Sequence, residues 1–495
     1  MMDQSTFPHP VYKDTVLAPL FEGAKAHYVD AVRAINRAHL VMLKETSILS
    51  EDVACSIAAA LVDIDETVDV GALKYTGEYE DYFFLIEAEL KSRLGADIAG
   101  MLHTARSRND MDHTVFKLAL KTRVDQLISK GHRLANAMLE KATADRDTII
   151  VAYTHGQPAQ PSTFGHYLSA ALEVLLRDLD RLQAARDALD HCPMGAAAIT
   201  TSGFPINRER MAKLLGFSEP LRNSYGCIAS VDYVTGLYSS IKLIFLHIGR
   251  LVQDFQFWTA FEVGQLYVPN SLVQISSIMP QKRNPVPIEH LRHLASVTCG
   301  RCDTMVNTMH NTPFTDMNDS EGEVQQAGYT TFESGGRVLE LLAALITDCS
   351  IRDDKVQANV DAACITITEL ADTLVRDEDL SFRQAHEIAA TTSRAVIEAG
   401  KPLREGFPAF SRAFRAHANR ETSLSEGSFS KAVSARTFID LRDRTGGPAP
   451  RAMDISLTHY SEHLSTQIST QSEIQVRENQ AATLLDTAFQ ALMQE

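Results

Sequence analysis

The chain is poor in the features that mark secreted and membrane proteins. Its 495 residues hold only seven cysteines and one tryptophan, and no apolar run is long enough to cross a bilayer. The cysteines are scattered and odd in number, which favours a reducing compartment over a disulfide framework. No basic segment followed by an apolar one opens the chain, so no signal peptide is predicted. We therefore expect a cytoplasmic protein without a membrane partner.

Positive charge is also scarce. Lys and Arg number 47 against 63 Asp and Glu, and the formal net charge is −16 at pH 7. This excess of negative charge argues against a nucleic acid or an anionic membrane as partner. An anionic small molecule stays compatible with it, because a local basic pocket can lie on an acidic protein.

A metal-binding pattern is missing as well. Cys299 and Cys302 form the one C-x-x-C motif of the sequence. A metal or redox role for such a motif needs a second pair of ligands or a βαβ context. Neither is present, so we interpret both residues as packed core thiols and predict no metal site.

The dominant pattern is helical. Apolar residues recur at helical spacing over long stretches, whereas the alternation typical of β-strands is scarce. The sequence therefore predicts an all-α protein with a central bundle of long helices. The five long helices are expected at 110–141, 163–182, 228–261, 285–309 and 324–349.

Several of these helices are apolar on more than one face, for example at Ile241, Leu243, Ile244 and Phe245. Such a helix must be buried on all sides. A thick single-chain bundle would satisfy this, and so would partner helices, and we favour an oligomer. Changes in helix length and in glycine and proline content predict three helical domains, at 1–106, 107–361 and 362–495.

The most informative stretch runs from Val273 to Glu289. Two adjacent hydroxyls, Ser276 and Ser277, precede Lys282 and Asn284, and two prolines then open a helix. Polar donors, a cation and a helix N-terminus in one short loop predict a site for a carboxylate. The plain alternative is a surface loop with ordinary capping residues.

Two further polar clusters are of the same kind. One contains Ser107, Arg108 and Asn109, ahead of the first long helix, and the other contains Thr154 and His155, ahead of the second. A simple cap or a structural histidine would explain either one alone. Three such clusters, each expected at a helix N-terminus, favour one composite site.

Together these motifs resemble the argininosuccinate lyase family of the fumarase/aspartase superfamily. The resemblance rests on Arg-Ser-Arg-Asn-Asp at 106–110, Tyr-Thr-His-x-Gln-Pro-Ala-Gln-Pro at 153–161 and Ser-Ser-x-Met-Pro-x-Lys-x-Asn-Pro at 276–285. Motifs at 381–387 and 446–450 extend it to the C-terminal region. The resemblance implies an all-helical homotetramer whose active sites each draw on three chains. It also implies a dicarboxylate substrate and no metal or organic cofactor.

Eliminating an amine from an N-succinyl group requires removal of a proton beside a carboxylate and stabilisation of the resulting charge. By resemblance, Ser276 is the base and His155 protonates the leaving nitrogen, with Glu289 keeping His155 basic. The reverse assignment of acid and base stays open. The residues expected to bind substrate and developing charge are Ser107, Arg108, Asn109, Thr154, Ser277, Lys282 and Asn284.

The sequence departs from the family where the leaving amine would lie. Phe314, Asn318 and Glu321 occupy places that a Tyr, a Gln and a Lys hold in the family, in a segment one residue shorter. Further substitutions there are Ala24, Phe83 and Val286. If Glu321 faces the pocket it repels the carboxylate of an arginine-like amine, and favours an amine lacking it or carrying a second positive group. The alternative is that Glu321 turns outward and caps the following helix.

The sequence thus predicts a carbon–nitrogen lyase that releases fumarate from an N-succinyl amine, or adds the amine in reverse. The runner-up is a genuine argininosuccinate lyase. A non-catalytic, crystallin-like protein is the rival from another class. Loss of Ser276, His155 or Lys282 would have favoured that rival, and all three are present.

Overall fold

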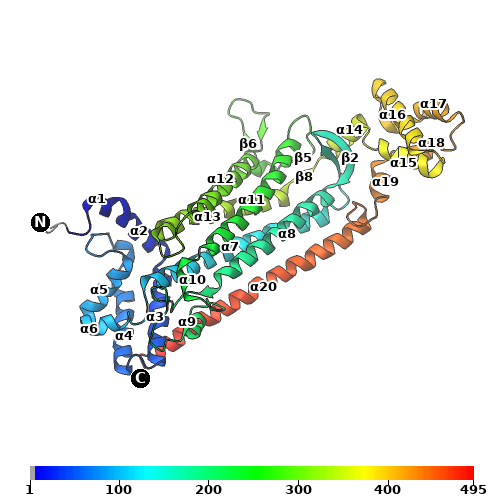
Figure 1. Cartoon of the computed structure of the whole chain (residues 1–495). Helices are drawn as coiled ribbons and strands as arrows, with labels where there is room; N and C mark the ends of the chain where they lie inside the picture. The colour runs from blue at the N-terminus through cyan, green and yellow to red at the C-terminus, as the bar shows by residue number, and fades with distance from the viewer. Residues whose placement is uncertain (1–5, 495) are drawn as a thin grey trace.

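Five long helices form the centre of the molecule in the computed structural model, which describes residues 6–494 (Figure 1). They confirm the five helices expected from apolar spacing, with ends displaced by several residues. Their bounds are α7 Arg108–Ala144, α8 Phe164–Leu189, α11 Asp232–Trp258, α12 Val286–Thr308 and α13 Gly322–Asp348.

The five helices pack side by side. Helix α7 lies against α8 and α13, while α11 lies against α8 and α12, and α12 lies against α13. On α11 the side chains of Val234, Ile241 and Phe255 are fully buried, whereas Leu246 on another face is 45% exposed. The chain therefore covers only part of the apolar surface that the sequence placed on this helix.

Shorter helices at the N-terminal end share the same hydrophobic core as the bundle. Their bounds are α1 Pro10–Tyr12, a π-helical turn Lys13–Leu17, α2 Ala18–His27, α3 Val29–Glu45, α4 Glu51–Thr67, α5 Tyr82–Leu94 and α6 Ala96–Met101. Two more short helices, α9 Arg208–Leu214 and α10 Ser224–Ala229, lie between α8 and α11. Single 3-10 turns occur at Val70–Ala72, Asn270–Leu272, Asn318–Ser320 and Leu403–Glu405.

The fold is mostly helical, and within residues 6–494 eight short strands, which the sequence analysis did not predict, form four pairs. Strand β1 (Ile149–Thr154) pairs antiparallel with β2 (Gln157–Thr163), and β6 (Gln274–Ile275) pairs antiparallel with β7 (Arg283–Asn284). The other pairs are β3 His191–Cys192 with β4 Glu219–Pro220, and β5 Leu266–Tyr267 with β8 Ser350–Ile351. These strands are too short, or too rich in proline and polar residues, to show an alternating pattern.

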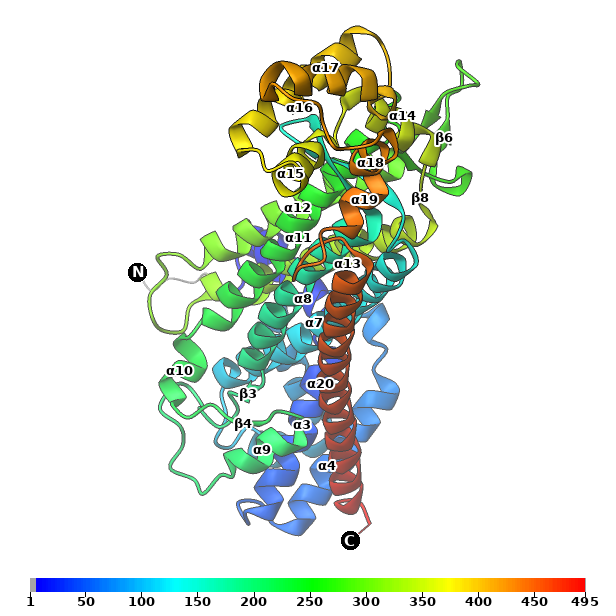
Figure 2. The ribbon, with the colours of Figure 1, turned by 90° about the vertical axis from the view of Figure 1, so that its right-hand side faces the viewer.

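The C-terminal region consists of two parts that pack differently. A separate hydrophobic cluster centred on Phe410, Phe414 and Phe429 holds the helices of residues 364–433 together at one end of the bundle. The 42-residue helix α20, Pro450–Ala491, then returns along the whole bundle and packs on α3, α7, α8 and α9 (Figure 2). The helices of this end are α14 Asp353–Ala363, α15 Ile367–Asp377, α16 Phe382–Glu398, α17 Phe407–Ala418, α18 Glu426–Ala432 and α19 Ala435–Asp440.

Of the two thiols predicted to pack in the core, Cys299 is only partly buried against it. All seven cysteines are free thiols, and Cys302 is fully buried in the main core. Within residues 6–494, no helix combines the length and the apolarity needed to cross a bilayer.

A buried ionic cluster fastens α20 to the bundle. The fully buried guanidinium of Arg186 on α8 donates to Asp125 on α7 at 2.9 and 3.2 Å and also pairs with Glu478 on α20. Lys121 pairs with Asp190 and with Glu478 at 2.8 and 2.9 Å. Because buried charges are costly without partners, each member of this cluster needs the others.

Replacing Arg186 with Met should therefore lower the free energy of unfolding by about 3–5 kcal/mol, since Asp125 loses its cation in the core. The matched control is Arg177→Met on the same helix, whose pair with Glu173 is about half exposed. Arg177→Met should change the free energy of unfolding by no more than about 1 kcal/mol. Urea unfolding at one fixed protein concentration measures both, and equal effects would show that the cluster does not hold α20.

Candidate functional site

The first polar cluster is fixed by the start of α7. Ser107 caps the helix in a capping box with Asp110, whose carboxylate also accepts backbone N–H groups of Gly195 and Ala197, each at 2.9 Å. Burial raises the pKa of Asp110 to about 6, although these hydrogen bonds act against the shift. The Ser107 hydroxyl donates to Asn109 Oδ1 at 3.0 Å. The expected N-cap is confirmed, and it holds the hydroxyl and the amide side by side.

The two arginines of this cluster have different surroundings. Arg106 is buried beneath the helix start, donates to Asn36 at 2.7 Å, and has its pKa lowered to about 10 by burial. Arg108 instead pairs with Glu80 at 3.0 Å and Asp81 at 2.8 Å. Of the two, only Arg108 lines the neighbouring pocket.

The second cluster lies on a hairpin, which corrects the expectation that each cluster opens a helix. Thr154 pairs with Gln157, and the two residues between them, His155 and Gly156, have φ of +55° and +72°. Two successive positive φ values fit the tight turn that joins twisted antiparallel strands. Thr154 and His155 are therefore exposed at the tip of the hairpin.

The third cluster lies on a loop between β6 and β7 that projects from the bundle (Figure 1). Ser276 Oγ accepts hydrogen bonds from the backbone N–H groups of Met279 at 3.0 Å and Ile278 at 3.3 Å. Ile275 and Ile278 are 76% and 84% exposed. Arg283 anchors the base of the loop by donating to the Val268 carbonyl oxygen at 2.7 Å. The loop tip thus presents Ser276 beside apolar side chains that the chain itself does not cover.

Residues at the two ends of this loop confirm how α12 begins. Pro285 is the N-cap and Pro287 lies in the first turn, followed by Glu289, which is exposed. Ser277 and Lys282 are also exposed, and Asn284 pairs with Gln274 in the short β-ladder. Among residues 6–494, no hydrogen bond or ion pair joins Glu289 to His155.

The three clusters do not meet within one chain. Ser107 stands at the beginning of α7, and the His155 hairpin follows the end of this 37-residue helix, about 55 Å away at 1.5 Å per residue. The Ser276 loop also lies at the end of the bundle away from Ser107. Helix α12 begins at this loop and runs 23 residues, about 35 Å, toward the segment at 316–326 that lines the cavity with Arg108.

The segment expected to contact the leaving amine lies at the Ser107 end. Asn318 and Glu321 line a cavity of about 660 Å³ together with Arg108 and Asn109. Ala24 and Phe83 line it as well. Phe314 does not, because its exposed ring stacks on Tyr225 with centroids 5.9 Å apart. Glu321 is the N-cap of α13 by position, but its side chain makes no capping hydrogen bond, so the outward-capping alternative is wrong.

Three titratable residues near Glu321 were not among the predicted site residues, namely Asp112, His113 and Asp316. Asp112 and Asp316 line the same cavity, and acceptor atoms of His113, Asp316 and Glu321 lie within 4.8 Å of one another. Burial raises the pKa of Glu321 to about 7, and the facing Asp316 carboxylate adds to the shift, while Arg108 opposes it. Burial and the nearby Glu321 raise the pKa of Asp112 well above its usual range. Asp112 follows Arg108 by four residues on one helix face, which was the available signal.

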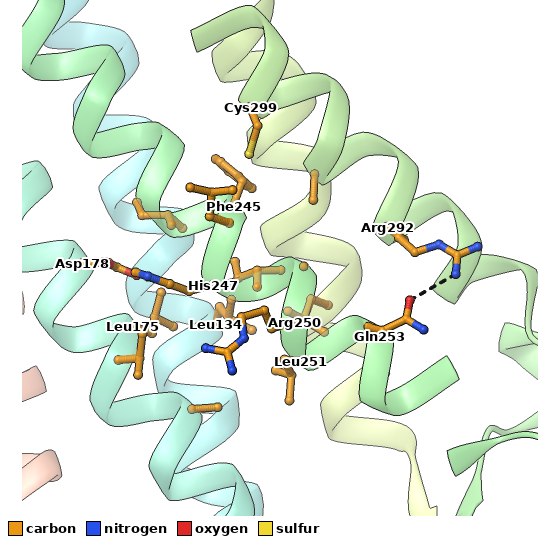
Figure 3. Close-up of a pocket in the computed structure, with 18 of the residues that line it drawn as sticks. Leu134, Leu175, Asp178, Phe245, His247, Arg250, Leu251, Gln253, Arg292 and Cys299 are labelled. Atoms are coloured by element: carbon orange, nitrogen blue, oxygen red, sulfur yellow. Dashed lines mark hydrogen bonds and ion pairs between the residues drawn. The ribbon is translucent and has the colours of Figure 1, made fainter. Parts of the chain in front are cut away.

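A larger groove of about 1150 Å³ lies midway along the bundle, against α8, α11 and α12 (Figure 3). His247 and Asp178 point toward one another there, with Nδ1 and Oδ2 2.6 Å apart, and Arg292 donates to Gln253 at 3.3 Å. Apolar side chains such as Leu251 make up much of its wall. None of the residues predicted to act on substrate lines this groove, so it is distinct from the candidate site.

Comparison with known proteins settles the family. A family model described as lyase matches residues 26–300, and one described as argininosuccinate lyase C-terminal matches residues 364–434. Argininosuccinate lyase 2 of Agrobacterium fabrum is 62% identical over 92% of this chain and 91% of its own length. The chain belongs to the argininosuccinate lyase family. It is therefore a carbon–nitrogen lyase of the argininosuccinate-lyase type, as the motifs predicted.

Other relatives agree. Argininosuccinate lyase 1 of Shouchella clausii is 31% identical over 88% of each chain. Among solved structures, a variant of EDDS lyase with bound fumarate superposes with a TM-score of 0.85, covering 99% of this chain and 97% of that chain at 26% identity. The fold of the superfamily is thus shared over almost the whole chain.

The raised pKa of Glu321 has a consequence for stability. In the unfolded chain this carboxyl titrates near 4.5 and in the folded protein near 7, so its ionisation destabilises the folded state increasingly from pH 4.5 to pH 7. At pH 8 the free energy of unfolding of Glu321→Gln should therefore be higher than that of the wild type by about 1–3 kcal/mol. This advantage should shrink as the pH falls below 7 and vanish below 4.5.

The control is Glu323→Gln, an exposed carboxylate in the first turn of the same helix. Its substitution removes the same charge from the same helix turn without touching the buried carboxyl, so it shows how much of the effect comes from burial. Urea unfolding of all three proteins at pH 5 and pH 8 gives the comparison. A Glu321→Gln effect of equal size at both values would show that the carboxyl is not held in an unfavourable environment.

Proposed function

We propose that this protein releases fumarate from an N-succinyl amine by general acid–base elimination, in a site that two or more chains build together. The observation that carries the proposal is the surroundings of Ser276. Two backbone N–H groups donate to its Oγ. Donors of this kind stabilise an oxyanion and so lower the pKa of a hydroxyl that must act as a base.

The three polar clusters have different roles in the proposed reaction. Ser276 takes the proton from the carbon beside one carboxylate, and the electron pair spreads into that carboxylate. Ser107, Asn109, Thr154, Ser277, Lys282 and Asn284 would bind the resulting dianion. The carbon–nitrogen bond then breaks, and His155 gives a proton to the departing nitrogen, which leaves fumarate and a free amine.

An oligomer is proposed because single chains keep the clusters apart. A rigid helix of about 55 Å separates Ser107 from the His155 hairpin. The exposed Ile275 and Ile278 of the loop, and exposed Leu246 beside the groove on α11, are apolar surfaces that further chains could cover. These features support an oligomer, and the family resemblance implies a homotetramer with long helices at its centre.

The test of the base is Ser276→Ala. Fumarate release, followed by the absorbance of its double bond, should fall by at least about 100-fold with argininosuccinate or with a panel of N-succinyl amines. Thermal unfolding should not change. The control, Gln281→Ala, alters an exposed side chain of the same loop and should keep most of the activity. A loss of less than about tenfold, roughly 1.4 kcal/mol of barrier, would exclude Ser276 as the base.

If each site is built from several chains, two inactive variants should restore activity when their subunits are mixed. Ser276→Ala and Asn109→Ala proteins should each be nearly inactive, because each loses one cluster in every site. After subunits exchange in an equal mixture, about a quarter of the sites should combine both intact residues from different chains. Activity should rise accordingly, and the mixing itself is verified by native mass spectrometry of tagged chains. Full exchange without recovery would contradict a site built from different chains.

A further inference from the structure

The hairpin that ends in Thr154 and His155 has backbone groups that its own two strands do not satisfy. Strands β1 and β2 form a two-stranded sheet, and within residues 6–494 no third strand pairs with β1. Val151 on β1 is fully buried and faces Pro161 on β2. Because proline has no N–H, Pro161 cannot donate to the carbonyl oxygen of Val151. The buried N–H and C=O of Val151 therefore need partners outside the hairpin.

Gln265 supplies both partners. Its Oε1 accepts the N–H of Val151 at 3.1 Å, and its Nε2 donates to the carbonyl oxygen of Val151 at 3.2 Å. The side-chain amide thus takes the place of a third strand beside β1. Gln265 is itself fully buried. A buried amide is costly unless it is hydrogen-bonded, and here both of its polar atoms bind one residue of the hairpin.

Gln265 is held in turn by the main bundle. Its carbonyl oxygen accepts the N–H of Arg352 at 2.9 Å. The two residues that follow it form β5, which pairs with β8 at Ser350–Ile351. Strand β5 lies in the segment after α11, and β8 lies directly after α13. The bonds from Gln265 to Val151 therefore tie the hairpin to the ends of two long helices.

The apolar contacts of the hairpin cannot replace these bonds. Val151 packs with Val356 and Val360, and the ring of Tyr153 meets Phe257 edge-on, with centroids 5.1 Å apart. Apolar contacts stabilise the hairpin without direction, so they tolerate a small sliding or tilting of β1. The two hydrogen bonds of Gln265 are directional and fix the position of Val151 along the strand.

We propose that Gln265 is a positioning residue for the turn at Thr154 and His155. By holding Val151, it keeps the imidazole of His155 where it can protonate the departing nitrogen. This inference rests on the proposed function, in which His155 is the acid. Because Gln265 is fully buried, it acts through the hairpin and not by contact with substrate. A displacement of about 1 Å at a reacting group can slow a reaction by about 100-fold, so the position of β1 matters for the rate.

The first test is Gln265→Leu, which removes both hydrogen bonds and keeps a side chain of similar size. With the substrate that the wild type cleaves fastest, kcat should fall at least about tenfold. The matched control is Gln471→Leu on α20, which removes a buried amide that donates to Asp125 at 3.0 Å. Both changes should lower the midpoint of urea unfolding, but only Gln265→Leu should lower kcat. An unchanged kcat in Gln265→Leu would overturn the inference.

A double-mutant cycle separates positioning of His155 from general support of the fold. In a His155→Ala background, Gln265→Leu should lower kcat by less than about threefold, because the group that it positions is already gone. Equal losses in both backgrounds would overturn the inference. A wild-type kcat in His155→Ala would contradict the proposed acid, and the inference would fail with it. A slow His155→Ala enzyme beside an unaffected Gln265→Leu enzyme would contradict the inference alone.

The conservative variant Gln265→Glu tests the two bonds directly and serves even if Gln265→Leu does not fold. A neutral carboxyl can accept from and donate to Val151 as the amide does, whereas an ionised one cannot donate. Burial raises the pKa of the introduced carboxyl, so kcat relative to the wild type should be nearly restored at about pH 6 and should fall toward about pH 9. Circular dichroism at the assay temperature verifies that the variant stays folded. A ratio that is low and constant over this range would overturn the inference.

Discussion

The rigidity of α7 is the constraint on which the rest of the arrangement depends. The helix is continuous from Arg108 to Ala144, with Ser107 capping one end and the hairpin of His155 following the other. A helix of this length cannot fold back on itself, so residues that are proposed to serve one reaction stand at opposite ends of the bundle. The packing of α8, α11, α12 and α13 around it preserves that separation, and α20 reinforces it through the buried cluster of Arg186.

The two ends of the bundle carry different kinds of groups. At the far end, the Ser276 loop and the His155 hairpin are exposed tips whose backbones are held by short β-ladders. At the near end, Asn109 and Arg108 lie at the wall of a cavity whose lining contains more carboxyl groups than cationic groups. In the proposed reaction, the loop and the hairpin supply the base and the acid. Glu321, which the sequence placed where the amine would bind, lies in that cavity.

The sequence predicted the long helices well, because their apolar spacing extends over many turns, and it identified the three clusters from unusual runs of polar residues. Its polar run contained two N-cap types, Ser107 and Asn109, and Ser107 is the one that caps α7. It failed for the hairpin at 149–163, where prolines and polar residues hide the strands, and for α20. That helix is mostly polar on its outer face, so nothing local showed that residues 450–491 return to the bundle.

The residue types, their order and the family follow from the sequence alone, because catalytic motifs are contiguous runs whose spacing is visible without coordinates. Which residues share a space was decided only by tertiary structure. Asp112 and His113 on α7 meet Asp316 and Glu321 only because α13 begins beside the start of α7. Likewise, the distance between Ser107 and His155 is set by the length and straightness of a helix, which is why the proposed site needs more than one chain. Burial, which gives Glu321 its unusual pKa, is a property of the packed molecule and leaves no mark in the local sequence.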